Sequence, residues 1–263
     1  MDLGLQGRRA LVMGASKGLG RSVAEALAAE GAALVISGRE QQTLDSVCEV
    51  LRGLGAASAI GIPADVGSAA DMDRLCDGAL AALGGGVDVV FLNHGGPPPG
   101  SAVDLSPDAL EQWFRPTVLS PIQVANRLLP GMRERGWGRI IAVGSVGMQQ
   151  PVPNLAISNT LRAAIVGWTK TLSLEVARDG VTVNVLAPGA FHTDRIVQTA
   201  QAAADKAGKP VEEVMAQRAK TIPAGRYGQP REYGPMAAFI ASEQAAYLTG
   251  TIVRVDGGAM IAI

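Results

Sequence analysis

Seven short runs of apolar residues, separated by longer segments with helical periodicity, constrain the fold of this chain more than any other feature. The runs are apolar at consecutive rather than alternating positions, which is typical of strands covered on both faces. Strands that alternate with helices predict an α/β fold, a doubly wound parallel sheet with helices on both faces. The seven runs are RRALVMG, AALVISG, ASAIGIPA, VDVVFLN, GRIIAVGS, VTVNVLAPG and TIVRVDGG.

The segments between these strands read as helices that end near a glycine or a proline. Two of them are long, from about Pro107 to Arg135 and from about Asn154 to Arg178. One irregular zone, 194–229, carries helical patches broken at Gly208-Lys209-Pro210, and a segment of this length beside a ligand crevice indicates a lid. No linker or repeat divides the sequence, so we expect 1–263 to form a single domain.

Composition limits the partners that such a chain can have. The 263 residues are 48% apolar, and 23 scattered basic residues against 24 acidic ones leave a net charge of −1, which predicts binding neither to nucleic acid nor to a charged membrane surface. No stretch approaches the roughly 18 apolar residues of a membrane span. We therefore expect a cytoplasmic protein with a small-molecule substrate. Cys48 and Cys76 lack a CxxC pattern, and no metal site is expected.

The first strand runs into a glycine-rich turn, GASKGLG, that opens the first helix. Glycine lets the chain leave the strand sharply and approach a pyrophosphate, to which the helix N-terminus offers free N–H groups. Glycine-rich turns also serve packing, but this position favours a Rossmann-type dinucleotide site. The residues of the turn expected to bind the cofactor are Gly14, Ser16, Lys17, Gly18, Leu19 and Gly20.

The end of the second strand indicates which dinucleotide is bound. An NAD site usually has an acidic residue there to accept from the ribose 2′-hydroxyl. This chain has Ser37-Gly38-Arg39 instead. Arg39, joined by Lys17, offers cations where a 2′-phosphate would lie, so we predict NADP(H) as the cofactor. The alternative is that both are ordinary solvated charges.

Together with further motifs, these glycines resemble the short-chain dehydrogenase/reductase family over essentially the whole chain. The similarity is greatest to its 3-oxoacyl-carrier-protein-reductase-like members. The motifs are Asp65-Val66, Asn93-His94-Gly95, Ser145, Pro188-Gly189 and Asp256-Gly257-Gly258.

The resemblance implies further cofactor contacts beyond the glycine turn. It implies that Asp65, with Val66, contacts adenine, and that Asn93 and Gly95 support the cofactor crevice. It also implies that a segment at the nicotinamide end contacts that ring, namely Pro188, Gly189 and Thr193. The chain departs from the family at His94, where alanine is usual, and at Met13, where a threonine often precedes the first glycine.

The family's catalytic set is an asparagine, a serine, and a tyrosine and lysine spaced YxxxK. Counting from Ser145 without gaps, the tyrosine position holds Ser158 and the lysine position holds Arg162, while the asparagine position holds Thr117. Only Ser145 matches. No shifted tyrosine restores the motif, because the three tyrosines come far later in the chain, at Tyr227, Tyr233 and Tyr247.

These substitutions change the chemistry that the resemblance implies. A serine alcohol is a much weaker acid than a phenol, and arginine stays a cation and shuttles no proton. Ser158 and Arg162 share one helix face. Arg162 could hold the nicotinamide ribose and a negative oxygen, with Ser145 donating to that oxygen and Ser158 relaying a proton. Alternatively, Ser158 only makes room for substrate and Arg162 forms a structural ion pair.

Two histidines are the remaining acid/base candidates. His94 follows the fourth strand and His192 precedes Thr193, so both are expected in loops at the carboxyl edge of the sheet, where ligands bind. A supporting or surface role is the alternative for each. The proton donor therefore stays open between Ser158, these histidines and water.

The resulting functional prediction is an NADP(H)-dependent oxidoreductase of the carbonyl reductase or alcohol dehydrogenase type, with an atypical mechanism. One alternative is a redox-neutral dehydratase, isomerase, cyclase or lyase on the same scaffold, and another is a non-catalytic NADP(H)-binding protein. The resemblance also implies a homodimer or homotetramer formed through the two long helices. The apolar tail Ala259–Ile263 would suit an interface or the chain's own core. Substrate and reaction direction are not specified.

Overall fold

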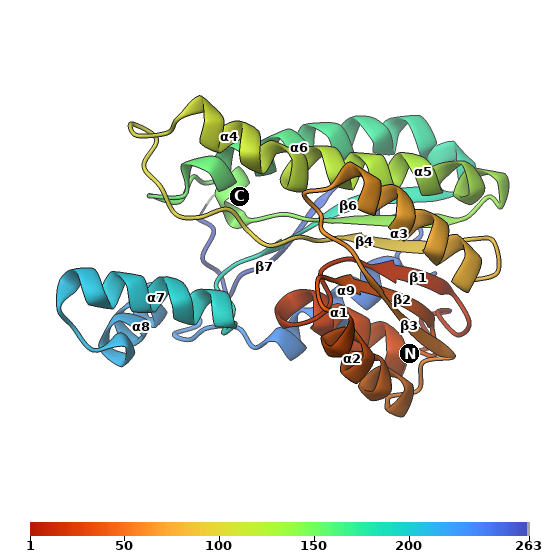
Figure 1. The fold of residues 1–263 in the computed structure, drawn as a ribbon, viewed down its shortest axis with the longest axis horizontal. Helices are drawn as coiled ribbons and strands as arrows, with labels where there is room; N and C mark the ends of the chain where they lie inside the picture. Colours follow the sequence, from red (N-terminus) through yellow and green to blue (C-terminus); the bar gives the residue numbers. More distant parts are fainter. Residues whose placement is uncertain (262–263) are drawn as a thin grey trace.

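Seven strands form one parallel sheet in the computed structural model, which describes residues 1–261 (Figure 1). The strands are β1 Arg9–Val12, β2 Ala33–Gly38, β3 Ser58–Pro63, β4 Val89–Leu92, β5 Gly138–Val143, β6 Val181–Pro188 and β7 Ile252–Val255. Their order in the described sheet is β3-β2-β1-β4-β5-β6-β7, and every neighbouring pair is parallel. The predicted doubly wound α/β fold is confirmed.

Helices cover both faces of the sheet, as Figure 1 shows, with α1, α2 and α9 on one side and α3, α5 and α6 on the other. The helices are α1 Gly18–Ala29, α2 Gln41–Gly53, α3 Ala69–Ala82, α4 Pro107–Phe114, α5 Ser120–Glu134, α6 Ala156–Val176, α7 Asp194–Ala207, α8 Val211–Lys220 and α9 Gly234–Ala241. Two apolar cores result, one on each face. Because both faces are covered, β4 and β5 are buried at every position, as their unbroken apolar runs predict.

The strand order reverses between β1 and β4, and this point fixes where a ligand can bind. In open α/β sheets the crevice lies beyond the carboxyl ends of the strands at such a reversal. Here the side-chain amide of Asn93, just after β4, donates to the carbonyls of Met13 (3.3 Å) and Gly14 (3.2 Å). These bonds tie the two loops that border the crevice.

The long helical span that begins at Pro107 is interrupted by one π-helical turn, η1, Arg115–Leu119. Pro116 lacks an N–H and cannot continue the regular ladder, and the backbone N–H of Ser120 instead reaches the carbonyl of Arg115 five residues back. Thr117 lies in this turn and is completely buried. The interruption turns one predicted helix into α4, η1 and α5.

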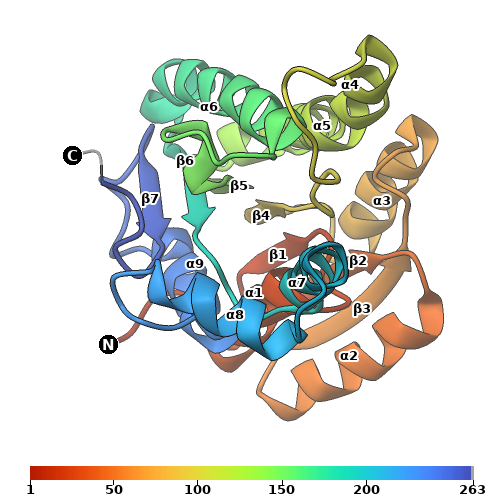
Figure 2. The ribbon, with the colours of Figure 1, turned by 90° about the vertical axis from the view of Figure 1, so that its left-hand side faces the viewer.

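The irregular zone after β6 folds into two helices, α7 and α8, that pack on each other. Gly208 ends α7 in the left-handed conformation (φ 63°), at the break that the sequence predicts. Both helices project from the body of the molecule in Figure 1, and in Figure 2, turned by 90°, they lie in front of it. Since α7 follows β6, the pair lies at the carboxyl edge of the sheet.

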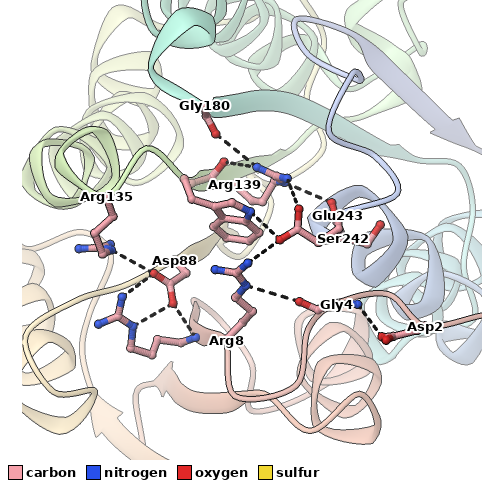
Figure 3. A network of polar contacts seen from close by, with 12 residues as sticks. Asp2, Gly4, Arg8, Asp88, Arg135, Arg139, Gly180, Ser242 and Glu243 are labelled. Carbon is pink, nitrogen blue, oxygen red and sulfur yellow. Dashed lines mark hydrogen bonds and ion pairs between the residues drawn. The ribbon is translucent and has the colours of Figure 1, made fainter.

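The opposite, amino edge of the sheet is held by an ionic network (Figure 3). The Asp88 carboxylate, 7% exposed, accepts from Arg9 Nε (2.8 Å) and Nη2 (2.6 Å), and Arg135 Nε lies 3.2 Å away. Burial alone would raise the pKa of the Asp88 carboxyl, but the hydrogen bonds and charge of Arg9 hold it below its ordinary value. This network joins β1, β4 and the end of α5.

A second cluster in Figure 3 contains Arg8, Arg139 and Glu243, and these three residues contact the side chain of Trp137. The guanidinium carbons of Arg8 and Arg139 lie 3.8 and 4.1 Å from the centroid of its ring. Glu243 accepts from the indole Nε1 (2.9 Å) and pairs with Arg8 (2.5 Å). Arg139 is buried at the start of β5, so these contacts compensate its charge far from the crevice.

Three smaller expectations are addressed by the same structure. Cys48 and Cys76 are buried free thiols. Among residues 1–261, none of the helices has the length and apolarity needed to span a bilayer. The predicted interface role of the tail at 259–263 falls partly outside the described residues, which end at Ile261.

Candidate functional site

The glycine turn between β1 and α1 has the backbone that a phosphate cradle needs. Gly14 and Gly18 adopt φ of 59° and 60°, which side-chain-bearing residues rarely do. A Cβ on Gly20 would collide with the Gly14 carbonyl oxygen. Helix α1 starts at Gly18, and the side chain of its N-cap, Lys17, does not cap the first turn. The N–H groups of that turn can therefore serve a pyrophosphate, so the turn fits a dinucleotide.

The end of β2 lies against the same turn. The Ala15 N–H donates to the carbonyl of Ser37 (2.8 Å), and Ser16 Cβ is 3.1 Å from where a Gly38 Cβ would stand. Arg39 is exposed just beyond. Lys17 is also exposed, but its Nζ pairs with Asp194 at the start of α7 (3.0 Å). Leu19 points inward, against the core.

The loop after β3 borders the predicted adenine end. Asp65 is exposed, and its Oδ1 accepts from the Gly67 N–H (2.8 Å). The carbonyl of Val66 accepts the hydroxyl of Ser120 (2.6 Å), the first residue of α5. This contact fixes the loop to the helix face beneath it.

The loop after β6, at the predicted nicotinamide end, is tied to the last strand. Gly189 donates to Val255 (2.9 Å), and a Cβ on Gly189 would come within 2.6 Å of the Asp256 Cα, so only glycine fits there. Pro188 closes β6. The Thr193 Cγ2 is 3.7 Å from the position of a Gly18 Cβ, so the two predicted cofactor loops meet.

The three predicted catalytic residues come from two adjacent elements. Ser145 follows β5 by two residues and is half-buried, and its Oγ accepts from the Gly147 N–H (3.1 Å). Ser158 lies in the first turn of α6 and is half-buried. Arg162 follows one turn later on the same helix and is buried, 6% exposed.

Arg162 is a buried cation with few contacts. Its Nη1 donates to the carbonyl of Val143, at the end of β5, and its Nε has no hydrogen-bond partner among residues 1–261. Burial lowers its pKa to about 10, which leaves it charged at neutral pH. No carboxylate of the described chain forms an ion pair with it. The alternative of a structural ion pair therefore has no support in the described residues.

The two histidines differ sharply in their surroundings. His94 is buried, 6% exposed, with Nδ1 against the Gly95 carbonyl and Nε2 without a partner in the described structure. Burial and the charge of Arg162 lower its pKa well below 6.5, so it is neutral. His192 is exposed, and its ring meets the edge of Tyr227, 6.4 Å between centroids. Gly95 is exposed at the crevice.

The three tyrosines have different surroundings, and none of them lies on α6, the helix of Ser158 and Arg162. Tyr233 is buried on the face of α1 and α9, where its hydroxyl donates to the carbonyl of Leu186 (3.1 Å). Tyr247 is fully exposed. Tyr227 is buried near His192 with no partner for its hydroxyl in the described chain, and burial raises its pKa. The sequence does not show that Tyr227 lies close to the loop after β6, because the two segments are far apart in the chain.

The structure also places Arg195 at the site, a residue that the sequence motifs do not mark. From the first turn of α7 its Nη1 donates to the carbonyl of Gly96 (2.8 Å), and its Nη2 donates to that of Pro97. With the pair between Lys17 and Asp194, α7 is joined to both loops that border the crevice. Only contacts between distant segments show this role. Within residues 1–261, no three acidic, histidine or cysteine side chains form a metal-binding group.

Comparison with known proteins finds dehydrogenases and reductases along nearly the whole chain. Residues 14–260 match the family described as enoyl-(acyl carrier protein) reductase. The chain is 33% identical to human dehydrogenase/reductase SDR family member 4, over 97% of this chain and 88% of that protein. It is 31% identical to D-beta-hydroxybutyrate dehydrogenase of Cupriavidus necator, over 97% of this chain and 98% of that protein.

Solved structures share the fold over the full length. L-sorbose reductase of Gluconobacter frateurii, complexed with NADPH and L-sorbose, superposes with a TM-score of 0.94 at 28% identity and covers 100% of both chains.

Proposed function

Because this chain belongs to the short-chain dehydrogenase/reductase family, we propose that it is an NADP(H)-dependent oxidoreductase of the carbonyl reductase or alcohol dehydrogenase type that works without the family's tyrosine. The observation that carries the proposal is Arg162, a buried cation without a carboxylate partner in the described chain, one helical turn from Ser158 and bonded to the end of β5. A buried charge in that situation is costly unless a ligand makes use of it.

Cofactor binding in this proposal uses the residues around the reversal of strand order. The turn at Gly14, Gly18 and Gly20 receives the pyrophosphate, and Arg39 with Lys17 receives a 2′-phosphate. Asp65 and Val66 contact adenine, Asn93 and Gly95 support the crevice, and the loop of Pro188, Gly189 and Thr193 contacts nicotinamide. When bound, NADPH supplies the hydride.

The protein's own contribution is to orient the substrate oxygen and stabilise its negative charge. Arg162 supplies a permanent cation, and the Ser145 hydroxyl donates a hydrogen bond. The Ser158 hydroxyl forms no hydrogen bond within residues 1–261 that would hold it away from a ligand, and it relays the proton from water. Preorganised donors of this kind contribute roughly 10²- to 10³-fold to a rate.

The direct test measures NADPH oxidation with a panel of ketones that includes β-ketoacyl thioesters. We expect turnover by the wild type, and a drop in kcat of about 10²-fold for Ser145→Ala and more for Arg162→Met. Thr171→Val, an exposed residue on the same helix, is the control. NADPH binding without turnover on any carbonyl would sink the carbonyl reductase assignment.

A second candidate follows from the absence of an acid at the tyrosine position. Hydride addition to the β-carbon of an unsaturated carbonyl compound leaves an enolate, which a cation and a hydroxyl stabilise and which water protonates at the α-carbon. Addition to the carbonyl carbon leaves a far more basic alkoxide that needs an acid. The matched family description, enoyl-(acyl carrier protein) reductase, favours including enones and enoyl thioesters in the panel. Loss of the C=C absorbance together with NADPH identifies this outcome.

The redox-neutral and non-catalytic alternatives are tested in the same samples. Product formation without NADP(H), seen by mass spectrometry, would indicate a dehydratase, isomerase, cyclase or lyase. A non-catalytic binding protein would be indicated if Ser145→Ala left the NADPH affinity unchanged and no compound in the panel were turned over.

We also propose that α7 and α8 act as a lid over a small-molecule substrate.

We propose further that copies of the chain associate through α5 and α6. Two exposed apolar side chains support this association: Leu119 (38% exposed), just before α5, and Leu174 (73% exposed), on α6. Light scattering of wild type and Leu174→Glu tests it, with a smaller particle expected for the variant.

A further inference from the structure

Three buried polar side chains at the carboxyl edge of the sheet each have one atom without a hydrogen-bond partner in the described chain. The atoms are His94 Nε2, Thr117 Oγ1 and Arg162 Nε. The three residues are 6%, 0% and 6% exposed. Because an unpaired buried donor or acceptor is costly, such atoms are rare, and a group of them points to shared function.

The topology brings the three residues to one place. Strands β4 and β5 are paired in parallel to the end of β4, so His94 follows beside the end of β5. Arg162 donates to the carbonyl of Val143 at that same end. Thr117 lies in η1, which packs against α6, the helix of Arg162. Arg162 is also the charged group that acts most strongly on His94.

The hydrogen bonding of His94 defines which ring nitrogen can accept. Its Nδ1 lies at hydrogen-bond distance from the Gly95 carbonyl, and a carbonyl only accepts, so Nδ1 carries the proton. Burial, Arg162 and Arg195 all disfavour a charged ring, while the Gly95 bond opposes them only in part. Nε2 is therefore a lone-pair acceptor. Arg162 Nε–H is a donor, and the Thr117 hydroxyl can do both.

We propose that His94 is a positioning residue for Arg162, whose Nε–H is linked to His94 Nε2 through one water shared with the Thr117 hydroxyl. A guanidinium held only by Nη1 on Val143 can still rotate. A second bond at Nε fixes its plane and leaves the remaining N–H groups for a ligand. This inference rests on the proposed role of Arg162 toward the nicotinamide ribose and a substrate oxygen.

The type of residue at position 94 suits that task. A carboxylate there would hold the guanidinium equally well but would cancel its charge and weaken oxygen stabilisation. A neutral imidazole orients the cation without neutralising it. This accounts for a histidine where the family usually has alanine, in a chain that also replaces the lysine with arginine.

The first test uses NMR on the full chain labelled with ¹⁵N-histidine and ¹⁵N-arginine, with NADPH present. We expect His94 to be neutral with Nδ1 protonated from about pH 6 to 8, and the Arg162 Nε–H to give a resonance protected from exchange. Arg162→Lys assigns that resonance. His94→Leu should abolish its protection, and His94→Gln, which places an amide oxygen near the Nε2 position, should keep it.

The second test measures NADPH affinity by fluorescence. We expect about tenfold weaker binding in His94→Leu, a smaller loss in Thr117→Val, and recovery to within about threefold in His94→Gln. Thr182→Val is the matched control, because Thr182 Oγ1 is also buried without a partner in the described chain but lies near the amino end of β6, away from the crevice.

The outcomes separate this inference from the proposed function. A protonated Nε2, a charged His94 ring, or an Arg162 resonance unchanged in His94→Leu would each overturn the positioning role. If the leucine variant does not fold, the tautomer of the wild type and the glutamine variant still decide. A wild type that shows the expected NMR signals but binds no NADPH would refute the proposed function and leave the contact between His94 and Arg162 intact.

Discussion

At the scale of single residues, the site combines a permanent cation with groups that do not titrate near neutrality. Arg162 keeps its proton, since burial lowers its pKa only to about 10, and His94 stays neutral because burial and Arg162 lower its pKa well below 6.5. Tyr227, which lies against His192, and Tyr233, which packs on Phe191, both have their pKa raised by burial. The proposed function therefore assigns the chemistry of this site to fixed charge rather than to a tuned acid.

This arrangement predicts a flat pH dependence. With the substrate found in the panel, kcat/KM should stay constant from about pH 7.5 to 9, because neither Arg162 nor His94 changes charge there. Steady-state rates in a constant-ionic-strength buffer check it. An ionisation inside that window would assign proton transfer to a group other than these two.

Arg39 decides the cofactor preference in the proposed function. Arg39→Asp removes the cation for the 2′-phosphate and supplies an acceptor for a ribose hydroxyl, so we expect NADPH binding to weaken by roughly 10- to 100-fold and NADH binding to tighten. Titration calorimetry with both cofactors measures this. Arg178→Asp, the same charge change at an exposed site beyond α6, should alter neither, and equal effects in both variants would contradict the assignment.

At the scale of elements, the turn between β1 and α1 is built around close backbone approach. Gly20→Ala places a methyl group against the Gly14 carbonyl, so we expect a loss of about 1–3 kcal/mol of unfolding free energy together with weaker NADPH binding. Gly53→Ala in α2 is the matched control, since an added Cβ there meets nothing within 4 Å. Urea denaturation compares the two. Similar losses in both would mean that the crowding at Gly20 is unimportant.

Helix α7 is held to the crevice by two contacts of unequal strength. Arg195 donates to two backbone carbonyls, at Gly96 and Pro97, whereas the pair of Lys17 with Asp194 is 67% exposed on each side and screened by solvent. We expect Arg195→Met to speed NADPH release by about tenfold and Asp194→Asn to change it little. Stopped-flow fluorescence gives both rates. An unchanged rate of NADPH release from Arg195→Met would show that Arg195 does not hold α7 over the bound cofactor.

At the scale of the whole molecule, the two edges of the sheet have separate tasks. The carboxyl edge carries partly unsatisfied polar groups, which the proposed function assigns to ligands, and the amino edge pairs its charges internally through Asp88, Arg9 and Arg135. Substitutions at the amino edge should therefore lower the free energy of unfolding without directly changing cofactor affinity.

Asp88 provides the test of that separation. Asp88→Asn removes charge-assisted hydrogen bonds, and we expect a loss of about 2–3 kcal/mol of unfolding free energy at pH 7. The folded-state pKa of Asp88 is below its unfolded value, so its contribution is full above about pH 4 and is lost as pH falls through the folded pKa. The variant should accordingly lose part of the wild type's acid dependence. Unfolding free energies of both proteins, measured down to pH 3, check this. The same decrease in stability at acid pH in both proteins would contradict it.

Much of this architecture is predictable from the chain alone, but not the site in full. The apolar strands and the helix break at Gly208 follow from local conformational preferences of the residues, and the folded chain keeps them. The single helix predicted across Pro107–Arg135 is interrupted in the structure, because Pro116 disrupts its ladder. Arg195 and Tyr227 carry no motif, since their positions depend on contacts across the fold rather than on neighbours in sequence.

Periodicity and residue chemistry are local properties, so the α/β fold and the glycine turn could be predicted from the chain. The assignment of Ser158 and Arg162 to the tyrosine and lysine positions came from counting along the family motif and stays a prediction. The sequence could not show that Arg162 is buried with no carboxylate partner in the described chain, or that its charge acts on a buried, neutral His94. Burial and pairing depend on which distant elements meet, and β4, β5, η1 and α6 meet only when the sheet is assembled.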